Sequence, residues 1–307
     1  MRKSNIEKSD FRPNKNHNCK VTQCGFVTEI MEMTNINFEP TMIKINADQG
    51  VILSTGEVVD FKKSSNRSEN AKGIRKSMKN LRDLLNANIT EVKNCRWVTL
   101  TYAENMQDYK RLYEDVKNYH KRWKYWHSKN NISIPEYIMA VEPQARGAWH
   151  CHIVYIYPDK APFIPNDTLS ELWGHGFVTV KKLDDVDNVG AYLTAYLCDV
   201  PVDELEELKE YSDNFEIKEC EFIDEHGKNQ KKKFAKGARI SLYPSGMNFF
   251  RSSRGVKRPV VEWTTLEKAN KKVSSDQLTF EKYIRLSNPD TGYENDISYK
   301  YYNSKRK

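Results

Sequence analysis

The chain has 307 residues, of which 30% are charged and 38% hydrophobic, and it carries a net charge of +7. This composition suits a soluble globular protein of one large domain with additions, or of two domains. A basic balance favours a polyanionic partner. No run approaches the roughly 18 apolar residues of a membrane span, and the N-terminus has no apolar signal core. We therefore expect a cytoplasmic protein with no membrane partner.

The cysteines do not form a recognisable framework. Cys19 and Cys24, with His17 nearby, are zinc-ligand types, but no second pair completes a set of four ligands. A cytosolic chain keeps such thiols reduced. We expect buried or surface thiols rather than disulfides.

The N-terminal part of the chain divides into two stretches. Residues 1–20 are basic and show no periodicity, which predicts a flexible arm, and residues 21–61 contain β-type runs broken by turns. We assign residues 1–66 to an N-terminal arm and accessory β region. A helix should begin near Ser68, because apolar residues then recur at helical spacing, at Ile74, Met78, Leu81 and Leu85.

The middle of the chain predicts a sheet with helices. Alternation predicts a half-buried strand over 97–102 and a hairpin of strands over 138–141 and 149–157, with a further strand over 177–180. Helices are expected over 107–129 and 187–197. His120 and His127 lie on the first of these helices and are expected to be surface or packing residues rather than ligands. The fold class is therefore α+β, a central antiparallel sheet with helices on one face.

Charge separates sharply in the last third of the chain. Residues 199–225 hold twelve acidic and two basic residues, whereas residues 229–258 hold nine basic and no acidic residues. The acidic stretch predicts a solvated insertion. The basic stretch interleaves aromatic residues with cations, as a single-strand DNA groove does, although a core strand with basic flanks fits too. The cations expected to bind DNA are Lys236, Arg239, Arg251 and Arg254, and residues 263–307 are expected to form a polar basic tail.

One stretch carries the pattern of a metal site. Side chains alternate faces along a strand, so His150 and His152 point the same way. Glu142 ends the preceding strand of the predicted hairpin and is close enough to be a third ligand. Two imidazoles and one carboxylate leave coordination positions open for water and substrate, as a catalytic metal requires. Such ligands suit Mg²⁺ or Mn²⁺ and do not exclude zinc.

A pair of tyrosines lies downstream. Tyr192 and Tyr196 are four residues apart in the predicted helix, so their hydroxyls share one face. Tyrosines on a helix commonly serve only in packing, and the pair alone does not decide between packing and chemistry.

Together these motifs resemble the rolling-circle replication initiators of the HUH endonuclease superfamily, in particular the two-tyrosine type of bacterial plasmids and small single-stranded DNA phages. Three motifs occur in the family's order, over roughly residues 68–262: Trp97–Tyr102, His150–His152 with Glu142 upstream, and Tyr192–Tyr196.

The resemblance implies a fold and a reaction. It implies a ferredoxin-like or RRM-like endonuclease domain over residues 67–262, with the acidic stretch as an insertion. It also implies that Tyr192, then Tyr196, attacks origin DNA and forms a 5′-phosphotyrosine while freeing a 3′-hydroxyl primer. The implied partners are a single-stranded origin, in hairpin form, and a host helicase in trans.

Two points leave alternatives open. Related motifs often carry a lysine where this chain has Ala195, so Lys181 and Lys182 become candidates for that role. A relaxase or a transposase shares the same chemistry, and a DNA-binding replication regulator without catalysis would keep the basic aromatic surface but would not need the histidines or tyrosines.

Overall fold

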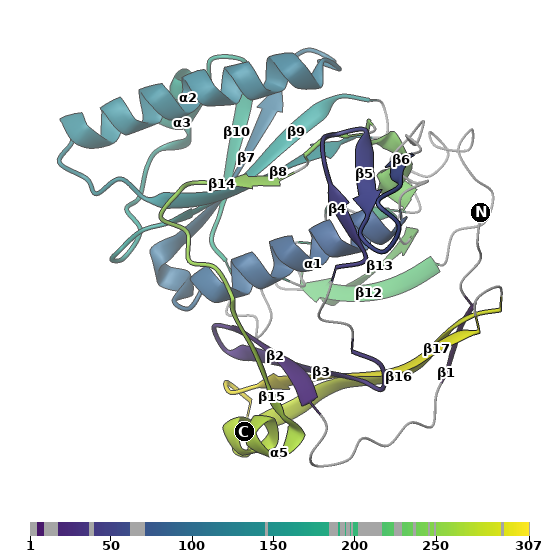
Figure 1. Ribbon diagram of the computed structural model, residues 1–307. Coiled ribbons are helices and arrows are strands. Elements are labelled where there is room, and N and C mark those ends of the chain that lie inside the picture. Colours follow the sequence, from purple (N-terminus) through teal and green to yellow (C-terminus); the bar gives the residue numbers. More distant parts are fainter. Residues whose placement is uncertain are drawn as a thin grey trace. The chain divides into compact units, whose positions relative to one another are not determined.

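The computed structural model describes residues 5–8, 18–36, 40–61, 71–144, 147–183, 190, 194, 197, 199–201, 217–223, 229–235, 238–244, 246–248, 250–289 and 292–306. The chain divides into two compact units (Figure 1). One unit is Met1–Ser64 together with Pro259–Lys307, and the other is Ser65–Arg258. The helices that the structure describes are all too short or too polar to cross a membrane.

The unit formed by Ser65–Arg258 is built on a five-stranded antiparallel sheet with the strand order β10-β7-β9-β8-β14. The strands of this sheet are β7 (Cys95–Tyr102), β8 (Glu136–Pro143), β9 (Trp149–Ile156), β10 (Gly176–Lys181) and β14 (Phe250–Ser252). Its helices are α1 (Ala71–Asn88), η2 (Val92–Asn94), α2 (Tyr109–Lys129), α3 (Asn166–Trp173) and η4 (Ala238–Leu242). The prediction of an α+β fold with a central antiparallel sheet is confirmed.

Helices cover both faces of this sheet, and not one face as the sequence suggested (Figure 1). On one face, Leu112, Val116 and Trp123 of α2 pack against Val98, Leu100 and other residues of the sheet. On the other face, Leu81, Leu84 and Leu85 of α1 pack against Trp97, Ile138 and Val154. The reason is that β7, β8 and β9 carry apolar residues at both odd and even positions, so each face must be buried.

The long helix α2 begins where the sequence places a capping residue. The carboxylate of Asp108 accepts hydrogen bonds from the backbone N–H groups of Lys110 (2.8 Å) and Arg111 (3.3 Å). These donors have no partner inside the helix, and a capping aspartate satisfies them. The cap fixes the start of α2 directly after the loop that follows β7.

The acidic stretch of residues 199–225 and the basic stretch of residues 229–258 contribute paired strands to one sheet. In a second sheet of this unit, β13 (Asn229–Ala235) lies between β11 (Val200–Pro201) and β12 (Ile217–Ile223). The register places Glu219 opposite Lys233 and Glu221 opposite Lys231. Opposite charges on facing positions stabilise an antiparallel pair. The described part of the acidic stretch is therefore half of a charge-complementary hairpin.

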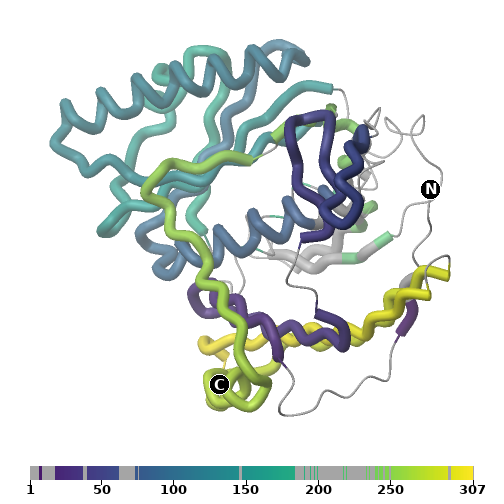
Figure 2. The backbone as a smooth tube through the Cα atoms, in the orientation of Figure 1, coloured from purple at the N-terminus to yellow at the C-terminus, as the bar shows by residue number. Residues whose placement is uncertain are grey.

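The other unit joins the two ends of the chain. Its six-stranded sheet has the order β1-β16-β17-β3-β2-β15, and strands near the N-terminus lie beside strands near the C-terminus (Figure 2). Its strands are β1 (Asn5–Lys8), β2 (Asn18–Cys24), β3 (Val27–Met33), β15 (Val260–Thr265), β16 (Gln277–Asn288) and β17 (Tyr293–Asn303), with helix α5 (Leu266–Lys272). A separate sheet holds β4 (Met42–Lys44), β5 (Gln49–Ile52) and β6 (Val58–Asp60).

Two expectations about this unit differ from the structure. Residues that the sequence analysis assigns to a polar tail form α5, β16 and β17, and part of the expected N-terminal arm forms β1 and β2. Cys19 and Cys24 are buried in β2 and are not part of a disulfide, and burial raises the pKa of the Cys19 thiol to about 11. His17 lies outside the described residues.

Candidate metal centre

The three predicted metal ligands come from two neighbouring strands. Glu142 on β8 lies directly opposite His150 on β9, and His152 follows two residues along β9. Facing residues of an antiparallel pair, and alternate residues of one strand, share a face of the sheet. All three side chains therefore stand on the face that packs against α1, at the strand ends beyond Ile138 and Val154 of its core.

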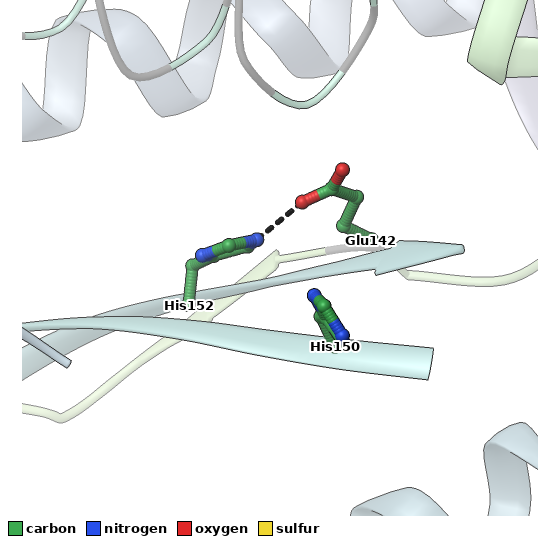
Figure 3. Close-up of side chains that lie close together, drawn as sticks. All are labelled: Glu142, His150 and His152. Carbon is green, nitrogen blue, oxygen red and sulfur yellow. Dashed lines mark hydrogen bonds and ion pairs between the residues drawn. The ribbon is translucent and has the colours of Figure 1, made fainter. Parts of the chain in front are cut away.

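The ligand atoms of these residues converge. The closest nitrogen or oxygen atoms of Glu142, His150 and His152 all lie within 4.8 Å of one another. His152 Nε2 contacts the Glu142 carboxylate, as the dashed line shows (Figure 3). Glu142 and His152 are buried and His150 is half-buried. The fold therefore shelters the site: His150 is partly exposed as a residue, but its Nε2 atom is buried.

The second nitrogen of His152 is held from the next strand. Thr99 on β7 lies opposite His152, and its Oγ1 is 3.1 Å from His152 Nδ1. The indole of Trp97 packs against the same imidazole, with ring centroids 5.8 Å apart. A hydrogen bond at one ring nitrogen fixes the orientation and tautomer of a ligating histidine. Thr99 can therefore present Nε2 of His152 toward Glu142.

Glu142 is also paired with a cation. Arg239 of η4 forms an ion pair with the second carboxylate oxygen of Glu142, and both side chains are buried. Burial alone would raise the pKa of the Glu142 carboxyl, but the facing His152 and the Arg239 guanidinium outweigh burial and lower this pKa. The carboxylate is ionised at neutral pH and available as a ligand.

This donor set fits a divalent cation. Ligands that sit about 2 Å from one ion lie roughly 3 to 4 Å from each other, so donor atoms already within 4.8 Å need only small side-chain rotations to share an ion. Two neutral nitrogens and one carboxylate leave positions free for water and a substrate oxygen. The residues that would hold the ion are Glu142, His150 and His152.

Gly190 and Leu197, which flank the predicted tyrosines in the sequence, are among the described residues. Tyr192 and Tyr196 themselves lie outside the described residues. The Gly190 N–H donates to the Asn86 side chain of α1 (2.8 Å), and a Cβ at Gly190 would collide with the Arg82 carbonyl oxygen. Only glycine permits this approach to α1. Leu197 is buried in the core between α1 and the sheet.

Two residues near η4 tie the end of this segment to β8. Arg239 Nη1 donates to the Pro143 carbonyl (3.0 Å), and Nη2 donates to the Asp199 carbonyl (3.3 Å). The hydroxyl of Tyr243 lies within hydrogen-bonding distance of the carbonyls of Val141 (2.9 Å) and Leu197 (3.2 Å). The backbone that follows the predicted tyrosines is therefore held against the strand that carries Glu142.

The predicted DNA-binding cations do not share one surface among the described residues. Arg239 is buried beside Glu142, and Arg254 is exposed after β14. Arg251 stacks on Tyr113 of α2, 3.7 Å from the ring centroid, and so lies on the sheet face opposite the histidines. Lys236 lies outside the described residues. Their contribution to DNA binding stays a prediction.

Sequence reasoning missed two residues of the site. For Thr99 the sequence did hold a signal: Thr99 and Thr101 are polar and alternate with apolar residues in strand β7, so both lie on one face of it. The pairing of Arg239 with Glu142 had no local signal, because the two residues are far apart in the chain.

The histidines of α2 pack as the sequence predicts. His120 is buried and stacks on Tyr137, with ring centroids 4.2 Å apart. His127 Nδ1 donates to the Trp123 carbonyl (2.9 Å), and the Tyr157 hydroxyl lies 2.9 Å from His127 Nε2. Both histidines belong to the α2 side of the sheet, away from the candidate metal centre.

Comparison with known proteins gives one match. Residues 95–200 match a family model described as replication-associated protein of the ORF2 type, which covers about a third of the chain. The matched stretch includes Glu142, His150 and His152 as well as Tyr192 and Tyr196. No curated protein and no solved structure matches the chain. The match supports a role in the initiation of DNA replication.

Proposed function

We propose that this protein is a metal-dependent DNA nickase and strand transferase that initiates rolling-circle replication. The observation that carries the proposal is the convergence of Glu142, His150 and His152 inside the stretch that matches the replication-associated family. A structural role for three such residues would not require two histidines and a carboxylate on one partly open face.

The chain's own residues divide the work. Glu142, His150 and His152 hold a divalent cation, Mg²⁺ or Mn²⁺, which when bound stabilises negative charge on the scissile phosphate. Thr99 orients His152, and Arg239 orients Glu142 and offsets part of its charge. A rigid first set of ligands lowers the reorganisation needed when the phosphate arrives.

Tyr192 is the proposed nucleophile. Its hydroxyl loses its proton to solvent, and the oxygen attacks the phosphorus. The bond from phosphorus to the 3′ oxygen breaks, and that oxygen takes up a proton. The products are a 5′-phosphotyrosine and a free 3′-hydroxyl. Because the phosphotyrosine keeps an ester bond, a second attack by Tyr196 or by a DNA hydroxyl rejoins the strand without ATP.

The substrate is single-stranded DNA at a replication origin, exposed in a hairpin. The chain has no G-x-x-x-x-G-K-[ST] phosphate loop, so a host helicase acting in trans unwinds the duplex. The reaction takes place in the cytoplasm.

A covalent-adduct assay tests this function. A pool of single-stranded oligonucleotides labelled at the 3′ end is incubated with the full chain and Mn²⁺, then run on a denaturing gel. The label must be at the 3′ end because the adduct retains the downstream fragment. We expect a labelled band at the size of the protein with Mn²⁺ and none with a chelator.

Matched variants separate chemistry from binding. His150→Ala and His152→Ala should abolish the adduct and weaken Mn²⁺ binding in calorimetry, while much of the DNA affinity remains because it comes from cation–phosphate contacts. Glu142→Ala should raise the Mn²⁺ concentration needed. Tyr125→Phe, which changes an exposed tyrosine of α2, should leave the adduct unchanged. Adduct formation that ignores the chelator would refute the proposal.

A further inference from the structure

An exposed aromatic ring stands in line with the metal centre. On the edge strand β10, Phe177 lies opposite Thr101 of β7, and Thr101 lies opposite His150 of β9. Directly facing residues share a face of the sheet, so Phe177, Thr101 and His150 form one row that ends at Glu142. The neighbours of Phe177 along the strand confirm this orientation, because Val178 faces the α2 core.

The exposure of Phe177 is unusual for its place. The residue is 68% exposed, although burying a phenylalanine would remove a large apolar surface from water. Single exposed apolar residues are common and need no explanation. Phe177 differs because it lies two strands from a candidate metal ligand, which is roughly 10 Å across the sheet at the usual strand spacing.

The surroundings of Phe177 suit a polyanion. Strands β7 and β10 carry no acidic residue. On the face of Phe177, β10 continues with the exposed residues Thr179 and Lys181, and Lys182 follows directly. An exposed ring on a strand whose far end carries two lysines, with no carboxylate on β7 or β10, has the composition of a site that stacks a base and contacts phosphates.

We propose that Phe177 is a stacking platform for one base of the single-stranded substrate, beside the scissile phosphate. This inference rests on the proposed function and adds to it the path of the DNA, across β10 and β7 toward His150. An aromatic face accepts any base, so the platform contributes affinity and position rather than sequence recognition. Phe177 lies at the opposite end of this row from Glu142, the residue that pairs with Arg239 of the basic stretch.

Stacking can be measured without cleavage. Fluorescence anisotropy, with no metal present, compares the affinity of the protein for two strands. One is an oligothymidylate of twelve nucleotides, and the other is an abasic strand of the same length that has the same phosphates but no bases. The wild-type chain should bind the oligothymidylate more tightly. Phe177→Ala should weaken binding of the oligothymidylate by about 5- to 150-fold and leave binding of the abasic strand unchanged. Phe177→Trp should restore the difference between the two strands.

Phe163→Ala is the matched control. Phe163 is 88% exposed, but it lies in the loop between β9 and α3, outside the row. This variant should bind both strands as the wild type does. Thermal melts of the three variants check folding, which an exposed position should not disturb.

The outcomes distinguish the platform from the enzyme. Equal affinity of wild type and Phe177→Ala for the oligothymidylate, or an equal loss for both strands, would overturn the platform. Because the assay contains no metal and no cleavage, that result would leave the proposed nickase intact. A different result would be base-dependent binding through Phe177 in a protein that forms no covalent adduct. That result would support the stacking proposal and overturn the proposed nickase function.

Discussion

The guanidinium of Arg239 pairs with the carboxylate of Glu142 and also donates to the backbone carbonyls of Pro143 and Asp199. One buried side chain thus contacts a candidate metal ligand, the end of its strand and the backbone just beyond the predicted tyrosines.

Replacement of Arg239 should destabilise the fold and the site together. Arg239→Met leaves Glu142 buried with one charged partner fewer, and removing one member of a buried pair costs about 3 to 5 kcal/mol. Urea denaturation should show this loss. Arg239→Lys keeps the charge but lacks the planar guanidinium that reaches both carbonyls. Its free energy of unfolding should therefore lie between those of the wild type and Arg239→Met. The double variant Glu142→Gln with Arg239→Met should lose less than the sum of the single changes; additive losses would mean that the pair is not coupled.

Thr99 should affect metal affinity through His152. Thr99→Val removes the hydrogen bond at Nδ1 and keeps the side-chain volume. Loss of such a partner typically weakens metal binding 10- to 100-fold, which Mn²⁺ calorimetry can detect. Thr101→Val, two residues along the same face of β7, is the control and should change little. Equal effects of both variants would argue for a general change of the strand.

The two tyrosines should act in order. Tyr192→Phe removes only the hydroxyl, so it should lose most adduct formation, or leave Tyr196 to substitute slowly. Tyr196→Phe should still form the first adduct but fail in the second transfer that releases a circle. Mass spectrometry of the nuclease-trimmed adduct identifies the modified residue. An adduct found mainly on Tyr196 in the wild type would reverse the order.

The predicted DNA-binding cations should set the salt dependence of DNA binding. Replacing Lys236, Arg251 and Arg254 together with glutamine should lower the slope of log affinity against log salt by about 0.7 for each lost phosphate contact. Arg239 is left out of this set because its replacement would disturb Glu142. An unchanged slope in anisotropy titrations would place the phosphate contacts elsewhere, such as at Lys181.

His120 should make stability depend on pH. Burial, and next the nearby charge of Lys124, lower the pKa of His120 from 6.5 to about 4 in the folded protein. Between these values the unfolded chain binds a proton that the folded chain does not. Stability should therefore fall as the pH drops from 6.5 toward 4, by roughly 3 kcal/mol for this residue.

The variant His120→Phe tests this assignment, because it keeps a ring against Tyr137 and cannot titrate. Urea denaturation at several pH values should show a smaller loss of stability on acidification than in the wild type. The difference between the two proteins isolates His120 from the carboxylates and from His127, whose pKa burial also lowers. Parallel curves for the two proteins would exclude His120 as the source.

The local elements around the site follow from patterns between neighbouring residues in the chain. Alternation and helical spacing depend only on neighbouring residues, so α1, β7, α2, the β8–β9 hairpin and β10 were predicted close to their observed bounds. The same alternation placed His150 and His152 on one face, and the short hairpin placed Glu142 opposite His150. The roles of Tyr192 and Tyr196 stay predictions, because these residues lie outside the described part of the chain.

The contacts between distant segments could not be predicted from local patterns and are seen only in the folded chain. The strands β16 and β17 have polar residues on both faces, so the sequence predicted a polar tail there. In the structure, β17 pairs with β3 from the other end of the chain. The sequence predicted Arg239 as a DNA-binding cation, whereas the fold buries its side chain against Glu142. The row from Phe177 to His150 exists because β10, β7 and β9 come together in one register. Strand pairing and ion pairs of this kind depend on which residues come close in space. The spacing of residues along the chain does not show which distant residues these are.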